Sequence, residues 1–492
     1  MSQFDHLTKQ KPYLNIPSNF SKGVDAMSVK RKISSHPYIP NSVPEVKAQM
    51  LQEIGIKSAE DIFGIIPDHL RFKGELNLPE AIVSEYELTK HVEELLAKNK
   101  NCKEYLNFLG GGCWQHYVPA VCKTIMERDE FLSAYVGEAF ADHGKWQAQF
   151  EYASCIAELV DMDMVNTPTY DWAMACATTV RMASRITGRN QALVATSISP
   201  ERLACIKNYA FSIVPDIVQV KCDPHTGLMD LEDLKAKISS KTACVYFENP
   251  NFFGVIESQA KEISRIAHEN GALVSVGVDP ISLGILAPPS HYGADIVCGD
   301  VQPLGIHMYA GGGLGGFIAT PDEPKFVAEY PSLLFGITPT IEPGEYGFGE
   351  VLFERTSYAS RDKAKDFLGT MAQLHGIVAG VYLSLMGPQG MKEIGETIMY
   401  KATYASRRLG KIKGVKILFS APHFKEFVVN FDGTGKTVKE INKALLQHKI
   451  HGGKDLSVDF PQFGQSALYC VTEIHSKKDL DYLADCLEKI VS

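Results

Sequence analysis

The fold of this chain is decided by the stretch QALVATS (191–197), PERLACIKNYA (200–210), IVQVKCD (217–223), MDLEDLKAKIS (229–239) and TACVYFENP (242–250). It continues with SQAKEISRIAHENG (258–271), ALVSVGVD (272–279), ADIVCGD (294–300) and GGFIAT (315–320). Short runs rich in β-branched and apolar residues alternate here with runs at helical spacing. Strands separated by helices predict βαβ crossovers, and therefore an α/β domain with a mostly parallel sheet.

The loops that follow these strands are where function is expected. In parallel α/β sheets, ligands bind beyond the carboxyl ends of the strands. Polar residues stand at three such ends: Asn249 to Asn251, Asp279, and Asp300 to Gln302. The sequence therefore predicts a functional site built from these three loops.

Outward from this stretch the chain divides into four predicted regions: a polar N-terminal arm (1–35), a helical lead-in (36–165), the large α/β domain (166–365), and a helix with a smaller α/β domain (366–492). The lead-in contains two predicted helices, one ending at Gly55 and one opened by Ser84, with Glu87 at the spacing of a capping box. In the last region, KEFVVNF (425–431) and ALYCVTE (467–473) are predicted strands.

Composition and charge exclude several classes of protein. The 492 residues carry a net charge of −9 and no basic block, which argues against a nucleic-acid partner. No apolar run reaches the roughly 18 residues that span a bilayer, so a membrane protein is not expected. The 11 cysteines are scattered without pairs, which predicts reduced thiols and a cytoplasmic location, and no spacing suits a metal site.

A large parallel-sheet domain followed by a small α/β domain resembles a fold-type I enzyme dependent on pyridoxal phosphate (PLP). Such an enzyme needs an aspartate near a strand end, which keeps the pyridine nitrogen protonated so that the ring acts as an electron sink. Asp279, at the end of VSVGV, suits that position, although a turn or helix-capping aspartate explains it equally well. The enzyme also needs a phosphate-binding helix start and a lysine that forms the Schiff base.

Both of those remaining requirements fail in this sequence. After Lys261 the next lysine is Lys325, and Gln302 stands near the place where the Schiff-base lysine is expected. At the expected phosphate position, Trp172 and Met174 replace the small residues that let backbone N–H groups approach a phosphate. We therefore expect that this chain alone does not hold PLP covalently.

The absence of the lysine goes together with a family resemblance. The chain resembles the α-type subunit of the two-subunit glycine dehydrogenase (decarboxylating), the P-protein of the glycine cleavage system, from about residue 36 to the end. The resemblance is carried by FLGGGCWQHYVPAV (108–121), IAELVDMDMVNTPTYD (156–171), PNFFGVIES (250–258), VDPISLGILAPPSHYGADIVCGDVQPLG (278–305), GVYLSLMGPQGMKEIGE (380–396) and CVTE (470–473).

The resemblance implies a subunit of a heterotetramer that decarboxylates glycine and passes the aminomethyl group to the lipoyl arm of a carrier protein. It implies that PLP is bound by a lysine-bearing β-type partner subunit, at an active site between the subunits. His116, Tyr135 and Asn251 are then candidates for contacts with that cofactor across the interface. A buried structural histidine, a core tyrosine and a turn asparagine are the alternatives, and no catalytic residue is assigned in this chain.

Three segments depart from the family pattern. The loop Tyr135 to Lys145 keeps only its first tyrosine, Trp172 stands in the helix start, and the basic segment at 361–364 is followed by Lys365-Asp366. Such loops can change the chemistry while the fold persists. A divergent paralogue acting on another amino acid, and a non-catalytic scaffold or regulatory subunit, therefore stay open. An independent PLP enzyme is disfavoured by the lysine-free window.

Overall fold

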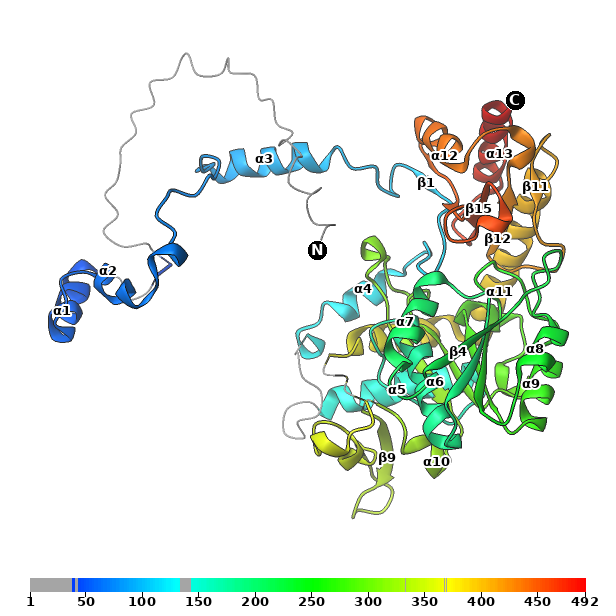
Figure 1. Cartoon of the computed structure of the whole chain (residues 1–492), viewed down its shortest axis with the longest axis horizontal. Coiled ribbons are helices and arrows are strands. Elements are labelled where there is room, and N and C mark those ends of the chain that lie inside the picture. Colours follow the sequence, from blue (N-terminus) through cyan, green and yellow to red (C-terminus); the bar gives the residue numbers. More distant parts are fainter. Residues whose placement is uncertain (1–37, 40–42, 133–142, 332, 367, 369) are drawn as a thin grey trace. The chain divides into compact units, whose positions relative to one another are not determined.

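The computed structural model describes residues 38–39, 43–132, 143–331, 333–366, 368 and 370–492, and Figure 1 labels its elements. These residues fall into two compact units, one ending at Leu96 and the other beginning at Ala97. The predicted arm at 1–35 and the candidate residue Tyr135 lie outside the described residues.

The N-terminal unit is a series of short helices: α1 (Pro44–Ile54), α2 (Ala59–Ile62) and α3 (Glu85–Leu96). Helix α1 ends at Gly55, whose φ of 80° is the left-handed conformation that glycine adopts readily, as the sequence predicts. Before α3, the Ser84 hydroxyl accepts the N–H of Glu87 at 3.3 Å. No described residue between 38 and 96 is buried, so the described part of this unit has no hydrophobic core of its own.

The second unit is built on a seven-stranded sheet in the order β2-β8-β7-β6-β5-β3-β4. Its strands are β2 (Met164–Val165), β3 (Gln191–Ala195), β4 (Asp216–Val220), β5 (Thr242–Glu248), β6 (Leu273–Val278), β7 (Ile296–Asp300) and β8 (Gly316–Thr320). The neighbours from β4 to β7 pair in parallel, whereas β8 is antiparallel to both β7 and β2. The predicted α/β fold with a mostly parallel sheet is confirmed.

Helices cover both faces of this sheet. Successive strand side chains point to opposite faces: Val245 and Phe247 of β5 join one apolar cluster, and Cys244 and Tyr246 join another. The first cluster includes residues of α5 (His143–Val160), α9 (Ala260–Glu269) and α11 (Gln373–Leu409). The second includes residues of α6 (Trp172–Thr187), α7 (Pro200–Ala210) and α10 (Pro324–Val327). Helix α8 (Leu231–Lys237) follows β4, and α4 (Ala120–Met126) precedes α5.

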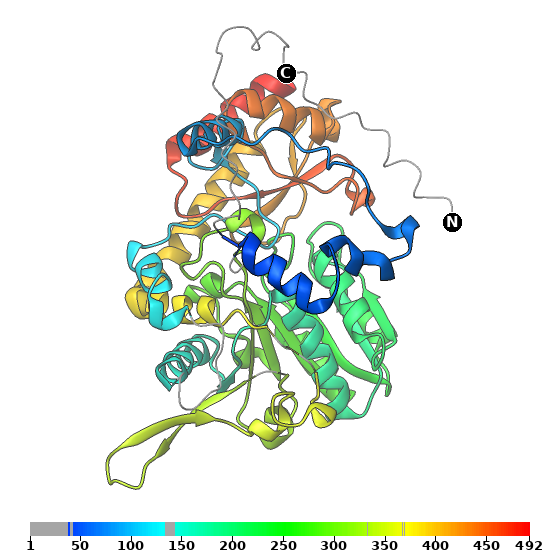
Figure 2. The same ribbon diagram turned by 90° about the vertical axis from the view of Figure 1, so that its left-hand side faces the viewer.

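A hairpin of β9 (Phe335–Pro339) and β10 (Tyr346–Glu350) extends from the large domain, as Figure 2 shows. Its base packs on α5, where the rings of Phe150 and Phe348 lie 5.5 Å apart between centroids.

The small C-terminal domain has a second sheet in the order β11-β12-β15-β14, covered by α12 (Val438–Gln447) and α13 (Lys477–Val491). Its strands are β11 (Lys416–Ile417), β12 (Glu426–Asn430), β14 (Lys454–Asp455) and β15 (Ser466–Cys470), all paired antiparallel. Helix α11 reaches this domain from the large one and is kinked at Gly387 and Pro388, since proline donates no backbone hydrogen bond.

The segment that precedes α4 joins the small domain to the large one. Strand β1 (Leu106–Asn107) pairs in parallel with β13 (Ile450–His451), and the carbonyl of Phe108 accepts the N–H of Cys470 at 2.9 Å. A few residues later, Trp114 is bound to the loop after β7. This segment, residues 108–117, therefore runs along the junction between the two domains.

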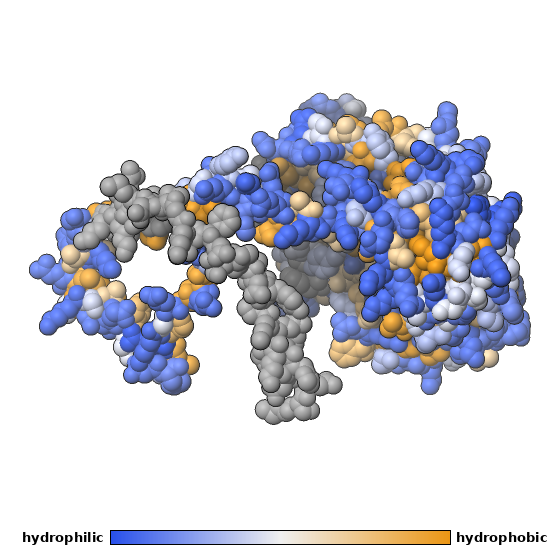
Figure 3. All heavy atoms as spheres, turned by 90° about the horizontal axis from the view of Figure 1, so that it is seen from above, coloured by the Kyte–Doolittle hydropathy of each residue, from blue (hydrophilic) through white to orange (hydrophobic). Residues whose placement is uncertain are grey.

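The face drawn in Figure 3 is mostly hydrophilic and is interrupted by small hydrophobic patches. Among the helices of the described residues, none combines the length and the apolar character needed to cross a bilayer.

Candidate functional site

The carboxyl ends of β5 and β6 meet the small domain around a cavity of only about 10 Å³. Asn251 and Asp279 line it from the large domain, and Lys425 and Glu426 from the small one, together with Trp114 of the 108–117 segment. A space of this size is near the lower limit for a single water molecule. Two of the three predicted strand-end loops thus line one cavity, which is filled by the chain's own side chains.

Lys425 occupies the position beside Asp279. Its Nζ atom lies 2.6 Å from Asp279 Oδ2, and the two side chains are only 1% and 7% exposed. The same ammonium lies 4.1 Å from the centroid of the Trp114 ring, a cation–π distance. The other oxygen of Asp279 accepts the N–H of Ile281 at 3.1 Å and caps the turn after β6. Both oxygens of Asp279 are thus engaged within the chain.

A hydrogen-bonded relay leads outward from this ion pair. Lys425 Nζ lies 2.9 Å from His116 Nε2, and His116 Nδ1 lies 2.7 Å from Glu473 Oε2. An ammonium group only donates, so His116 Nε2 accepts and its Nδ1–H donates to Glu473. We call the four residues Asp279, Lys425, His116 and Glu473 the relay. It connects both domains through the 108–117 segment.

Glu473 at the outer end of the relay is held as a carboxylate. Burial opposes the charge, but the interaction with His116 and the hydrogen bond from the Tyr117 N–H outweigh it and lower the pKa of Glu473 to about 2. The Tyr117 N–H donates to Glu473 Oε1 at 2.6 Å. Both carboxylate oxygens therefore have donors, which fixes the side chain in one orientation.

Two of the three glycines in the 108–117 segment, Gly110 and Gly111, approach Glu426 closely. Its Oε1 accepts the N–H of Gly111 at 2.5 Å, and a Cβ atom on Gly110 would come within 2.0 Å of the same oxygen. The close backbone approach that these glycines permit is thus toward the small domain. Burial raises the pKa of Glu426 to about 7 against the opposing effect of the Gly111 hydrogen bond.

The start of α6 is not a phosphate site. The N–H of Met174 donates to Asp171 Oδ1 at 2.7 Å, and the N–H of Trp172 donates to Asp300 Oδ2 at 3.0 Å. The Trp172 ring is buried under the guanidinium of Arg202, which lies 4.2 Å from the ring centroid. Two acidic side chains and an indole thus take the place that a phosphate dianion would need.

Gln302 fills the place after β7 where a Schiff-base lysine is expected. Its side chain is buried and makes three hydrogen bonds: Oε1 accepts from Trp114 N at 3.0 Å, and Nε2 donates to the carbonyls of Trp114 at 2.9 Å and Ile306 at 3.0 Å. No lysine lies near this strand end in the sequence, and the cavity has no room for a pyridine ring. The residues present here therefore do not fit PLP.

The structure gives two of the predicted site residues internal partners. His116 belongs to the relay. Asn251 is buried, donates to the carbonyl of Gly227 at 3.0 Å, and accepts the N–H groups of Phe253 and Val255. Their proposed contacts with a cofactor across a subunit interface stay a prediction. Lys425 and Glu473 were not predicted as site residues. In the sequence each is only a charged residue at the end of a predicted apolar strand.

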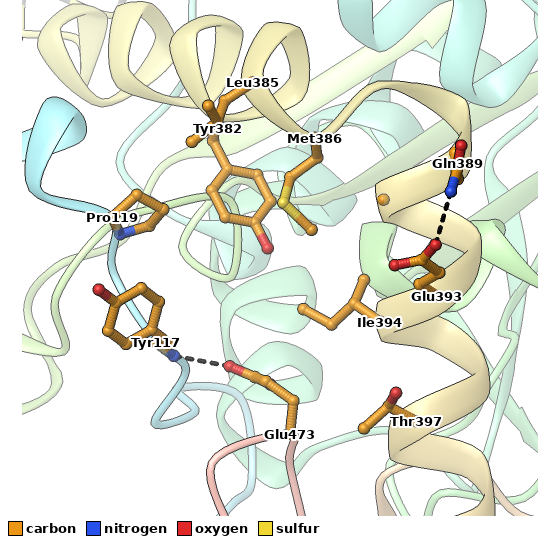
Figure 4. A pocket seen from close by; sticks show the side chains of 11 residues that line it. Tyr117, Pro119, Tyr382, Leu385, Met386, Gln389, Glu393, Ile394, Thr397 and Glu473 are labelled. Atoms are coloured by element: carbon orange, nitrogen blue, oxygen red, sulfur yellow. Dashed lines mark hydrogen bonds between the residues drawn. The ribbon is translucent and has the colours of Figure 1, made fainter.

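A cleft of about 570 Å³ opens beside the relay, and we call it the α11 cleft. Helix α11 forms one wall around its kink, and Tyr117 and Glu473 lie opposite, as Figure 4 shows. Glu473 is thus shared by the relay and the α11 cleft. Among the described residues, no group of three or more His, Cys, Asp or Glu side chains is placed to hold a metal ion.

Comparison with known proteins identifies close relatives over nearly the whole chain. The family model described as glycine cleavage system P-protein matches residues 36–487. Proteins named probable glycine dehydrogenase (decarboxylating) subunit 1 are similar: that of Staphylothermus marinus is 39% identical over 467 residues, 94% of this chain and 99% of the relative. That of Pyrococcus furiosus is 40% identical over 457 residues, 92% of this chain and 99% of the relative.

Solved structures agree with these relatives. A crystal structure of glycine decarboxylase (P-protein) of the glycine cleavage system, in inhibitor-bound form, superposes with a TM-score of 0.80 at 32% identity. The superposition covers 92% of the present chain and 100% of the glycine decarboxylase chain. A sphingosine-1-phosphate lyase of Burkholderia pseudomallei, with a TM-score of 0.62 at 14% identity over 87% of this chain and 94% of its own, shares the fold alone.

Proposed function

Because the chain belongs to the glycine cleavage system P-protein family, we propose that it works as subunit 1 of a two-subunit glycine dehydrogenase (decarboxylating). In this proposal a second, lysine-bearing subunit holds PLP. The present chain completes the active site from across the interface between the subunits. It is a necessary half of the enzyme and does not form a cofactor site of its own.

The main support for this proposal is that side chains of this chain fill the position where a fold-type I enzyme would hold PLP. Lys425 pairs with the aspartate that would otherwise face a pyridine nitrogen, and Gln302 stands where a Schiff-base lysine is expected. Trp172 and Asp300 take the place of a phosphate. The occupation of this position by the chain's own side chains supports a cofactor that is held by another polypeptide.

The rest of the proposal concerns the reaction and its location. We propose glycine as the substrate and the lipoyl arm of a carrier protein as the acceptor of the aminomethyl group, with PLP on the partner acting as the electron sink. The printed names of the relatives support glycine. We also place the protein in the cytoplasm, which is supported by eleven cysteines without disulfide bonds.

The test is reconstitution with the lysine-bearing subunit. Each subunit is purified alone and the two are then mixed, and exchange of labelled bicarbonate into the carboxyl group of glycine is measured. We expect exchange from the mixture and none from this chain alone. Exchange by this chain alone would contradict the proposal, and a mixture that uses another amino acid but not glycine would identify a divergent paralogue.

A further inference from the structure

The α11 cleft is a preformed site that the proposed reaction does not use. Its volume of about 570 Å³ lies within the range of ligand pockets. The walls come from the 108–117 segment, from both sides of the α11 kink, and from the loop after β15. The side chains of Tyr382, Met386 and Ile394 face the space that Tyr117 and Glu473 close from the other side (Figure 4).

The charge of the α11 cleft is negative. Glu473 is a carboxylate at neutral pH, since its pKa is lowered to about 2 by the groups described above, against its own burial. Glu393 lies on the opposite wall. Among the described contacts, its carboxylate accepts one hydrogen bond, from Gln389 Nε2 to Oε1 at 2.8 Å. None of the described lining residues is basic, and Lys401 donates instead to the backbone carbonyl of Glu473 at 2.6 Å.

A tyrosine hydroxyl that opens into the α11 cleft also has no partner among the described residues. The side chain of Tyr382 is 2% exposed, and its hydroxyl points into the cleft. No hydrogen bond joins this hydroxyl to another of the described residues, so it is open to water or to a ligand in the cleft. A ligand that donates hydrogen bonds would satisfy it, and the Tyr117 and Tyr382 rings would favour a cation.

The lining of the α11 cleft does not suit an anionic ligand. An amino acid substrate or a phosphate needs a basic group for its carboxylate or phosphate oxygens, and the described lining offers none. A purely apolar occupant would remove water from Glu473 and Glu393 without replacing it. A positive group on an apolar stem satisfies the carboxylates, the Tyr382 hydroxyl and the apolar wall together.

We propose that the α11 cleft receives a lysine or arginine side chain of the partner subunit, and so fixes how the two subunits dock. This inference rests on the proposed two-subunit function. The relay gives it a physical basis, because Lys425 and His116 hold Glu473 in position before the partner arrives. A charge that is fixed in advance costs less conformational entropy on binding than a mobile one.

The experiment measures the dissociation constant of the full-length chain and its lysine-bearing partner at low and high salt. Glu393→Gln removes one charge of the α11 cleft, and Thr397→Lys adds a basic group from the cleft's own wall. Glu396→Gln is the matched control, since Glu396 lies on the same helix, outside the α11 cleft, in an exposed pair with Lys392. Melting of each free variant verifies that it folds.

We expect Glu393→Gln and Thr397→Lys to weaken binding about tenfold at low salt, with a smaller difference at high salt, and Glu396→Gln to stay within about twofold. Both cleft variants binding as tightly as the wild type would overturn the inference and leave the proposed function intact. A wild-type chain that does not bind the partner would overturn both.

Discussion

Replacing Lys425 by methionine should lower the free energy of unfolding by about 3–5 kcal/mol, because the Asp279 carboxylate is left buried without its cation. The variant also loses the hydrogen bond to His116 and the contact with the Trp114 ring. Asp279→Asn should have a comparable effect, since it leaves the ammonium unpaired. Because each single variant strands one buried charge, the double variant should lie closer to the wild type than the sum of the singles. Urea unfolding of the four proteins measures these differences.

The matched control is Lys454→Met. Lys454 forms an ion pair of 3.3 Å with Glu201, whose side chain is largely exposed, so its removal should cost less than about 1 kcal/mol. The buried pair would not hold the two domains together if two results were found. Lys425→Met and Asp279→Asn would each lower the free energy of unfolding no more than Lys454→Met, and the double variant would lower it by the sum of the two.

Two buried carboxyl groups contribute stability that should be lost as the pH rises from about 4 to 7, because they keep their protons in the folded state. Burial raises the pKa of Asp300 from 3.8 to about 7, against three backbone hydrogen bonds, and raises that of Glu426 from 4.5 to about 7. The unfolded chain ionises these groups at their ordinary values, so the folded state loses relative stability until pH exceeds about 7. The full loss is about 4 kcal/mol for Asp300 and about 3 kcal/mol for Glu426.

Glu426→Gln isolates one of these contributions. Glutamine keeps an oxygen for the Gly111 N–H and cannot ionise, so about half of the fall in stability between pH 4.5 and 7 should disappear. Glu473 acts with the opposite sign, since its lowered pKa gives stability that is lost only as the pH falls from about 4.5 toward 2. Free energies of unfolding at several pH values measure the slope, and an exposed Glu488→Gln serves as the control. An unchanged slope in Glu426→Gln would contradict the assignment.

Much of the fold follows from the sequence because it is written in local patterns. Strands β3 to β7 lie in the predicted apolar runs, and the intervening helices enforce the parallel order. The short antiparallel strand β2 was not predicted, since two residues, Met164 and Val165, carry no period.

The strand-end residues Asn251 and Asp279, the candidate His116 and the missing lysine are the parts of the candidate site that the sequence predicts. The lysine-free window pointed to the missing Schiff-base residue without any structure, and Gln302 is buried there. The relay could not be predicted, because His116 and Glu473 are 357 positions apart and meet only when the small domain packs on the 108–117 segment. Nor does the sequence show that Lys425, the first residue of a predicted strand, turns inward to Asp279.

We propose that this chain's own cofactor position is closed and that PLP is held by the partner subunit. The isolated chain, its Gln302→Lys variant and the two-subunit complex are each treated with borohydride in the presence of PLP. Peptide mapping then locates any reduced lysine adduct. We predict a reduced lysine adduct on the partner only. The Gln302→Lys variant should also retain no PLP at its new lysine, since Lys425 and Trp172 still fill the position. A stable adduct on a lysine of the isolated wild-type chain would contradict the proposal that PLP is held by the partner subunit.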